Sequence, residues 1–512
     1  MQIVGISAPG TLEKRLCQLV ISRLNGNDIR DKEYRAKMAG LVEKGIGGFI
    51  VFGGEREEVR AFLRSLQSMA AVPLFIASDI ERGVVQQITG TTPFPCPMAI
   101  AAAVERDDPE AVALLDAALG AVAAEAMDTG INMPLIPVMD VNRNPDNPII
   151  CTRAFSDSPE MVSWFGVRYL SILGRAGLIP CAKHFPGHGD TAVDSHIALP
   201  VIGKSRTDLM ETDILPFRRA VEAGAGSIMI GHLTVPALDG RPASLSRKVI
   251  TGLLREDLGF SGLVLTDALN MDALKDFGRV PVECINAGAD ILLHPSDADD
   301  AVRELHHAVV AGELAEETVE TAVARILKAK EGLGAAHNNI PPGIPDLIAH
   351  RALSSALVER SITLVRHAPG LLPVAGDGVL LVLAGDPSFH EETPLRGYFR
   401  DVVPLRATGD LSGRKAVFAL FTSVAAWRGS SGIEAGERDR ILALLRKAGP
   451  SLVISFGSPY VLRYFEEAAC LIAAYEATPS AQEAVLRCLK GERNFRGRLP
   501  VDPSLFPGKK EK

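Results

Sequence analysis

Short, continuous apolar runs recur along residues 40–330, and they limit the possible folds of this chain more than any other feature. The runs, which start at residues 47, 73, 132, 178, 227, 262 and 290, are GGFIVF, PLFIAS, NMPLIPVM, LIPCAK, SIMIGH, GLVLTD and DILLHP. A strand that is buried on both faces needs such a run, because the side chains on both of its faces are removed from water. Amphipathic stretches separate the runs, and two of them, 158–176 and 206–223, end at a glycine that suits a helix exit. The pattern predicts parallel strands joined by helices.

At least seven such units in one block predict a (β/α)8, TIM-like barrel, and a doubly wound open sheet is the alternative. Ionisable residues at the carboxyl ends of the runs favour the barrel, because all these ends converge on one rim of a barrel. They are Asp79, Asp140, Lys183, His184, His232 and Asp267. The simpler interpretation is that a strand end is polar because the chain leaves the core there.

A second block of apolar runs follows a segment rich in proline and glycine, AAHNNIPPGIPDL, at residues 335–347. Its runs start at residues 378, 415, 451 and 470, and they again alternate with helical patterns. We therefore expect a barrel at 1–334, a linker at 335–350, a smaller α/β sandwich domain at 351–505 and a disordered tail at 506–512.

Charge and cysteine usage exclude several classes of protein. The formal net charge of -8 provides no excess positive charge that would attract nucleic acid or an anionic membrane. No apolar run is long enough to span a bilayer. The first residues lack a basic stretch followed by an apolar core, which argues against a secretory signal. The seven cysteines are scattered and form no C-x-x-C pair, as is typical of reduced thiols. We therefore expect a cytoplasmic protein, either a monomer or a homodimer.

The segment KHFPGHGDTAVDSH at 183–196 concentrates ionisable residues on what should be a rim loop. One interpretation is a zinc site formed by the three histidines with Asp190 or Asp194, but proline and glycine prevent the helical ligand spacing of known zinc motifs. The other is acid/base catalysis. Asp194 and His196 are two residues apart, so in extended backbone both can point the same way, and the carboxylate can orient the imidazole.

Asp267 ends the run GLVLTD, so a strand delivers its carboxylate to the rim. Such a group can act as a nucleophile. The simpler interpretation is that Asp267 caps a helix that begins in the following ALNMDAL segment, and the two roles are not exclusive. Both interpretations stay open at this point.

The sequence resembles glycoside hydrolase family three, specifically its β-N-acetylglucosaminidase branch, and the resemblance covers most of the chain. It rests on GGFIVFGG at 47, SDIERGVVQQ at 78, FPCPMAIAAA at 94, INMPLIPVMDVNRNPDNPIICTRAFSDSPEMV at 131, KHFPGHGDTAVDSHIALP at 183, LPFRRAVEAGAGSIMIGH at 215, SGLVLTDALNMDAL at 261 and GRLPV at 497. The segment at 183–196 is the most specific of these.

The resemblance implies a retaining exo-glycosidase that releases terminal β-linked N-acetylglucosamine through a covalent glycosyl-enzyme. By motif, Asp267 is the nucleophile, His196 the acid/base and Asp194 the residue that orients His196. The sugar-binding residues implied are Asp79, Arg153, Lys183 and His184. His188, His232, Met271 and Gln87 are further candidates. No metal or cofactor is implied. The expected partner is a small-molecule or glycan substrate with terminal N-acetylglucosamine, and neither nucleic acid nor a membrane is expected as a partner.

The stretch at 79–88 departs from the family pattern, in which D-Q-E-G-G-R-V-Q-R-L is usual. The last arginine of that pattern is Gln87 here, and the internal arginine is Val84. This departure leaves the preferred glycan open. A β-glucosidase and a phosphorylase remain alternatives, as does a sugar-binding protein without catalysis. The expected biological setting is peptidoglycan recycling.

Overall fold

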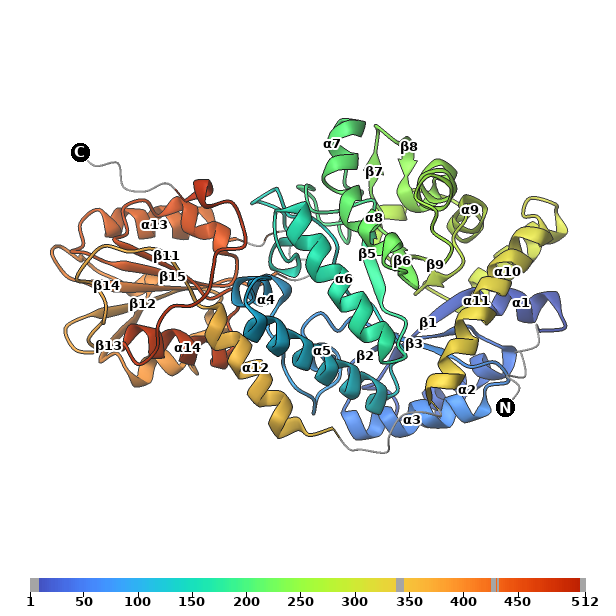
Figure 1. Cartoon of the computed structure of the whole chain (residues 1–512), viewed down its shortest axis with the longest axis horizontal. Helices are drawn as coiled ribbons and strands as arrows, with labels where there is room; N and C mark the ends of the chain where they lie inside the picture. The colour runs from blue at the N-terminus through green and yellow to red at the C-terminus, as the bar shows by residue number, and fades with distance from the viewer. Residues whose placement is uncertain (1–8, 338–344, 425–429, 431, 507–512) are drawn as a thin grey trace. The chain divides into compact units, whose positions relative to one another are not determined.

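The computed structural model describes residues 9–337, 345–424, 430 and 432–506, which form two compact units (Figure 1). Unit 1 consists of Met1–Phe94, Asp116–Val141 and Pro159–Arg351, and unit 2 of Pro95–Leu115, Asn142–Ser158 and Ala352–Lys512, each as far as it is described. The expected domain boundaries at 334 and 351 stay a prediction. Part of the expected linker, 338–344, and most of the expected tail, 507–512, lie outside the described residues.

Eight parallel strands form a closed ring in unit 1. They are β1 (Val20–Asn25), β2 (Gly48–Phe52), β3 (Phe75–Ser78), β4 (Met133–Pro134), β5 (Cys181–Phe185), β6 (Ser227–Ile230), β9 (Leu263–Thr266) and β10 (Leu292–Leu293). Hydrogen bonds join them in the orders β10-β1-β2-β3-β4 and β5-β6-β9. Parallel bridges from Val138 to Lys183 and from Leu265 to Ile291 close the ring between these two sheets. The predicted barrel is confirmed, and the open-sheet alternative is wrong.

Each of the seven predicted runs contains one strand of this ring, and the eighth strand, β1, was not predicted. Its sequence is VISRLN, in which Ser22 and Arg23 interrupt the apolar pattern. Arg23 is exposed although its strand lies between β10 and β2. A charged residue within a central strand hides that strand from any search for continuous apolar runs.

Helices follow most strands of the ring. They are α1 (Leu12–Gln18), α2 (Lys32–Lys44), α3 (Arg56–Met69), α5 (Pro109–Thr129), α6 (Pro159–Arg175), α7 (Arg206–Glu211), α8 (Ile214–Glu222), α9 (Val280–Ala287), α10 (Ala298–Val310) and α11 (Glu316–His337), with a π-helix at Lys248–Asp257 and a hairpin of β7 (Thr234–Val235) and β8 (Asp239–Pro242). No helix in the described parts of the chain combines the length and the apolar character that crossing a membrane requires.

The helix expected at 158–176 is observed as α6, whereas the single helix expected at 206–223 is wrong. The chain forms α7 and α8 instead, separated at Thr212 and Asp213. Pro216 explains the break. It has no N–H to donate to the carbonyl of Thr212 four residues earlier, and its ring would clash with that carbonyl in a continuous helix.

A buried ion-pair network stabilises the barrel at Asp290, which has no exposed surface. Its carboxylate accepts hydrogen bonds from Arg255 Nη2 at 2.7 Å, from Arg325 Nη1 at 3.0 Å and from the Val264 backbone N–H at 2.8 Å. Because this one carboxylate compensates two arginines and accepts a strand N–H, its loss leaves the charge of both arginines without a counter-ion and the Val264 N–H without its side-chain acceptor.

Asp290→Ala is therefore expected to lower the free energy of unfolding by about 3–5 kcal/mol, since it leaves buried charge uncompensated. Chemical denaturation measures this change. Asp299→Ala is the control, because Asp299 forms an exposed ion pair with Lys44, and its loss should cost about 1 kcal/mol or less. Equal midpoints for the two variants would contradict the assigned role of Asp290.

Unit 2 contains a six-stranded sheet in the order β11-β16-β15-β14-β12-β13. Its strands are β11 (Thr363–Arg366), β12 (Leu380–Gly385), β13 (Asp401–Pro404), β14 (Ala416–Phe421), β15 (Leu452–Phe456) and β16 (Cys470–Ala473), with helices α4 (Pro97–Ala103), α12 (Leu347–Ser361), α13 (Ala435–Leu445) and α14 (Pro479–Leu489). All pairs are parallel except β11 with β16. The four predicted runs of the second block are β12, β14, β15 and β16.

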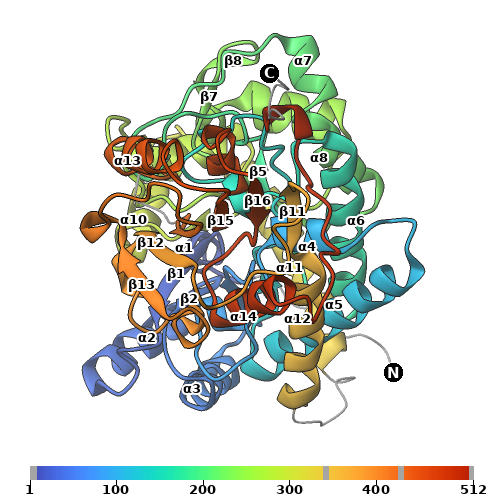
Figure 2. The ribbon, with the colours of Figure 1, turned by 90° about the vertical axis from the view of Figure 1, so that its left-hand side faces the viewer.

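Alternate residues of the central strands of unit 2 pack into two separate cores. In β12, for example, Val382 packs with residues of α13, and Leu381 packs with residues of α14. Helices therefore cover both faces of the sheet, as Figures 1 and 2 show for α13 and α14. This arrangement confirms the predicted smaller α/β sandwich.

Candidate active site

Asp267 follows β9 directly, at the carboxyl end of the barrel strands. Its backbone N–H donates to Ile230 O of the neighbouring strand β6 at 2.9 Å, which fixes the position of its Cα. Oδ1 accepts the Ala268 N–H at 2.8 Å, and the carboxylate accepts no other hydrogen bond from the described residues. The next helical segment, a 3-10 turn, begins only at Asp272. The alternative that Asp267 caps a helix is therefore wrong, and one carboxylate oxygen is left for chemistry.

The charge environment keeps Asp267 ionised. Burial alone would raise the pKa of this carboxyl, but the nearby side chains of His184, His232 and His196 outweigh that effect and lower the pKa to about 2. The same interactions place Asp267 within electrostatic range of the loop at 183–196. The strand-borne carboxylate and this loop thus belong to one site.

His196 is held by Asp194, as the spacing of the two residues predicted. Asp194 Oδ1 lies 2.9 Å from His196 Nδ1 and also accepts the backbone N–H of His196 at 2.9 Å. The Asp194 side chain is fully buried, whereas a quarter of the His196 side chain is exposed. Because the carboxylate engages Nδ1, it fixes the tautomer and the orientation of the ring.

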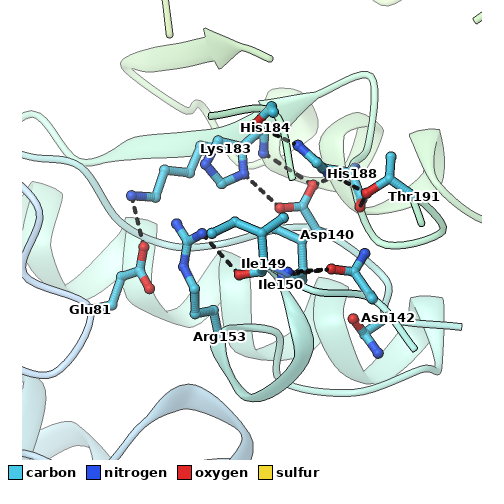
Figure 3. Close-up of polar contacts among 12 residues, drawn as sticks. Glu81, Asp140, Asn142, Ile149, Ile150, Arg153, Lys183, His184, His188 and Thr191 are labelled. Atoms are coloured by element: carbon cyan, nitrogen blue, oxygen red, sulfur yellow. Dashed lines mark hydrogen bonds and ion pairs between the residues drawn. The ribbon is translucent and has the colours of Figure 1, made fainter. Parts of the chain in front are cut away.

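Asp140 organises the start of this loop (Figure 3). Its Oδ2 lies 2.7 Å from His184 Nδ1, and its Oδ1 accepts the backbone N–H groups of His184 at 3.2 Å and His188 at 2.8 Å. Burial would raise the pKa of Asp140, but His184 outweighs this effect and holds the pKa below its usual value. An ionised Asp140 therefore orients the imidazole of His184 and leaves only its Nε2 to contact a ligand.

Both ring nitrogens of His188 are engaged inside the loop. Nδ1 lies 2.8 Å from Thr191 Oγ1, and Nε2 lies 3.0 Å from Ser195 Oγ. Burial lowers the pKa of His188 to about 4, so this ring is neutral near pH 7. His188 ties the first half of the loop to the segment that holds Asp194 and His196, and that position suits a structural role.

Lys183 is fully buried and bonds two carboxylates (Figure 3 shows one of them). Its Nζ lies 2.6 Å from Asp79 Oδ1 and 2.9 Å from Glu81 Oε1. A buried ammonium needs such compensation, and the pair of acids supplies it. Asp79 keeps about a quarter of its side chain exposed, so it presents a hydrogen-bond acceptor at the rim.

His232 and Met271 lie near Asp267. His232 Nε2 lies 3.2 Å from Ala268 O, and its Nδ1 lies 2.9 Å from Ser244 Oγ. Burial lowers the pKa of His232. Met271 is buried in the segment that follows Asp267. These contacts fix the backbone next to the carboxylate, whereas contact of either side chain with a ligand stays a prediction.

Arg153 and Gln87 are two further predicted sugar-binding positions. Arg153 belongs to a segment of unit 2, where its Nη1 donates to Ile149 O at 3.1 Å (Figure 3). Gln87 is half-buried at the end of a short 3-10 turn, Val84–Gln86. A role of either residue in sugar binding stays a prediction.

The histidines and acids of the 183–196 loop have partners other than a metal. Within the described ranges, no three His, Cys, Asp or Glu side chains lie together in a way that could hold a metal ion. The loop instead pairs Asp194 with His196 and Lys204 with Asp190.

Sequence reasoning missed three residues at this end of the barrel. Glu81 was seen only as part of a changed motif, although it neutralises Lys183. Arg23 lies in β1 and His294 directly follows β10, the strand paired with β1, and their proximity to Asp79 is visible only in the folded chain. The one signal in the sequence was His294, which directly follows the apolar run DILL.

Comparison with known proteins agrees with this geometry. Residues 11–329 match the model of the glycosyl hydrolase family 3 N-terminal domain. The β-hexosaminidase A of Pseudoalteromonas piscicida is 33% identical over 406 residues, or 71% of this chain and 67% of that protein. A β-N-acetylglucosaminidase/β-glucosidase of Cellulomonas fimi is 28% identical over 505 residues, or 89% and 88% of the two chains.

A solved structure has the same fold over nearly the whole length. It is the glycoside hydrolase family 3 β-N-acetylglucosaminidase from Paenibacillus sp. strain FPU-7, with a TM-score of 0.80 and 29% identity, and the match covers 97% of this chain and 99% of that one. On the strength of the matched domain, which spans more than half of the sequence, the chain belongs to glycosyl hydrolase family 3.

Proposed function

We propose that this protein is a retaining exo-β-N-acetylglucosaminidase with Asp267 as nucleophile and His196 as acid/base. One observation carries the proposal. The ionised carboxylate of Asp267, at a strand end, lies within electrostatic range of the His196 imidazole, and the buried carboxylate of Asp194 contacts Nδ1 of that imidazole. The names of the relatives, β-hexosaminidase and β-N-acetylglucosaminidase, agree with that activity. The protein is a glycoside hydrolase that acts on N-acetylhexosaminides.

In the first step, the free carboxylate oxygen of Asp267 attacks the anomeric carbon of the terminal sugar. The glycosidic C–O bond breaks, and His196 Nε2 donates its proton to the departing oxygen. A covalent glycosyl-enzyme and a neutral alcohol result. The buried carboxylate of Asp194 stabilises the imidazolium before this step and keeps its ring in place.

In the second step, neutral His196 Nε2 takes a proton from water while the water oxygen attacks the anomeric carbon. The bond to Asp267 breaks, and the sugar leaves with its original configuration after two inversions. In this proposal His184 Nε2, the exposed part of Asp79 and the ammonium of Lys183 bind the hydroxyl groups and the amide of the sugar, which is consistent with their charged and hydrogen-bonding groups.

The proposed natural substrate is a glycan that ends in β-linked N-acetylglucosamine. Release of this sugar from cell-wall fragments in the cytoplasm, as in peptidoglycan recycling, stays a prediction. Hydrolysis of a purified disaccharide of N-acetylglucosamine and anhydro-muramic acid, compared with hydrolysis of chitobiose, would test this choice of substrate.

A second candidate activity is β-glucosidase, because one relative of nearly full length carries both names. The experiment that separates the two compares kcat/KM on 4-nitrophenyl N-acetyl-β-glucosaminide and on 4-nitrophenyl β-glucoside. We expect at least about a hundredfold preference for the first, because glucose lacks the acetamide and would leave the protein groups that bind it without a partner. Equal values, or a preference for glucoside, would reject the proposed specificity.

Release of sugar 1-phosphate in phosphate buffer would identify a phosphorylase.

A further inference from the structure

Arg23 presents an unused cation at the carboxyl end of the barrel strands. In β1 it lies opposite Ile50 of β2, two residues before Asn25, which lies opposite Phe52. Residues two apart on a strand share a face, so Arg23 and Phe52 lie on the same face of the sheet. The guanidinium carbon lies 5.3 Å from the centre of the Phe52 ring. A cation-π contact of this kind holds the guanidinium in place without using its N–H donors.

Among the residues that the structure describes, Arg23 forms no ion pair and its side chain donates no hydrogen bond, although it is exposed and lies over an aromatic ring. Other arginines of the barrel, such as Arg56 and Arg255, bond an aspartate at less than 3 Å. An arginine on a rigid central strand with no internal partner is suited to bind a group from outside.

His294 supplies a second polar group beside Arg23. It directly follows β10, its backbone donates to Ile21 O of β1 at 2.8 Å, and its ring lies 5.7 Å from the Phe52 ring. The residue is 92% buried, yet its imidazole has no hydrogen-bond partner in the described part of the chain. Its φ of 49° is in the left-handed region, which is uncommon for a residue other than glycine and is often found at functional sites.

The two residues adjoin the proposed sugar site. Burial and the charge of Arg23 lower the pKa of His294 to about 4, and Asp79 acts on the same ring in the opposite direction. Arg23, His294 and Asp79 thus lie close enough for their charges to interact. The strands β10, β1, β2 and β3, which carry these groups, are consecutive in the sheet.

We propose that Arg23 and His294, supported by Phe52, form a recognition site for a negatively charged group of the glycan, next to Asp79. The inference rests on the proposed glycosidase function. The chemistry is that of a carboxylate, sulfate or phosphate. The planar guanidinium donates two parallel hydrogen bonds to such a group, and the neutral imidazole donates a third. The Lys183 ammonium lies between Asp79 and Glu81 and offsets their charge, which would otherwise oppose an anion.

Two sources of the anion can be separated by substrate. The first arm compares 4-nitrophenyl N-acetyl-β-glucosaminide with its 6-O-sulfate, which tests a charge on the transferred sugar. The second compares an aryl N-acetylglucosaminide that has a carboxylate on its leaving group with the matching carboxamide. In each arm we measure the ratio of kcat/KM for the charged substrate to kcat/KM for the neutral one, in wild type and in Arg23→Gln.

We expect the ratio to fall about tenfold or more in Arg23→Gln in one of the two arms, because a charge-assisted bidentate pair is lost. Arg23→Lys should retain part of the preference, and the wild-type preference should weaken at high salt. Arg175→Gln is the matched control, because Arg175 is exposed at the end of α6. An unchanged ratio in both arms, or equal losses on charged and neutral substrates, would overturn the proposal.

Binding without turnover separates failure of this inference from failure of the proposed function. Calorimetry compares the dissociation constants of N-acetylglucosamine 6-sulfate and N-acetylglucosamine for wild type, Arg23→Gln and His294→Leu, each checked for unfolding temperature. Tighter binding of the sulfate by wild type alone would support the site even in a protein that hydrolyses neither glycoside. If both arms and this measurement give no difference, the anion site is absent, whatever the glycosidase activity.

Discussion

Asp267→Ala is expected to hydrolyse 4-nitrophenyl N-acetyl-β-glucosaminide at least about 10⁴-fold more slowly than wild type, the order of loss for a residue that makes a covalent bond to substrate. The carboxylate is ionised, since its pKa is lowered to about 2, and it accepts only one hydrogen bond from the described residues. No other described group at the end of β9 can replace it. Initial rates of nitrophenol release measure the loss.

Azide distinguishes loss of the nucleophile from general damage to the site. In Asp267→Ala, azide can enter the space of the missing carboxylate and displace the leaving group once, which inverts the anomeric centre and gives the α-glycosyl azide. Asp276→Asn is the control, because Asp276 is exposed on the same segment and no catalytic role is assigned to it. Formation of the β-azide by Asp267→Ala, or undiminished hydrolysis, would refute the assignment.

The pKa of Asp267 also fixes one feature of the pH profile. An aspartate whose pKa is lowered on folding contributes stability above its usual pKa, and that contribution is lost as the pH falls toward about 2. The nucleophile therefore stays ionised throughout the neutral and weakly acidic range. Any fall of kcat/KM on either side of neutrality must come from other groups.

The barrel could be predicted from the sequence because its strands are buried on both faces. Burial on both faces forces continuous apolar runs, which reveal seven of the eight strands regardless of how they are joined. The eighth, β1, contains Arg23, so the residue that hides the strand is the one that the structure places at the rim. The break between α7 and α8 was missed for a local reason, because Pro216 outweighs an otherwise helical pattern.

The site was predictable where its contacts are local in sequence, or where a strand end delivers the residue. The pair of Asp194 and His196 is local, and two residues of separation suffice to predict their contact. The bond between Lys183 and Glu81 joins residues about a hundred positions apart, and nothing in either segment specifies it. Closure of the ring brings β3 and β5 to one rim, and only that closure reveals which acid neutralises which base.

His196→Ala is expected to lose activity in proportion to how much the leaving group needs a proton. Chitobiose, whose leaving oxygen is strongly basic, should be cleaved about 10²–10⁴-fold more slowly, the usual contribution of a general acid. A 2,4-dinitrophenyl glycoside needs no proton in the first step, so its cleavage to the glycosyl-enzyme should be nearly unchanged. His307→Gln is the control, because His307 is exposed on α10.

The second step should then limit turnover of the activated substrate, because no base remains to take a proton from water. Azide needs no base, so it should restore turnover of the dinitrophenyl glycoside by His196→Ala and give the β-azide, since Asp267 still performs the first inversion. Asp194→Asn keeps the shape but removes the charge that stabilises the imidazolium, and an intermediate loss on chitobiose is expected. Equal losses on both leaving groups would show that His196 binds sugar and transfers no proton.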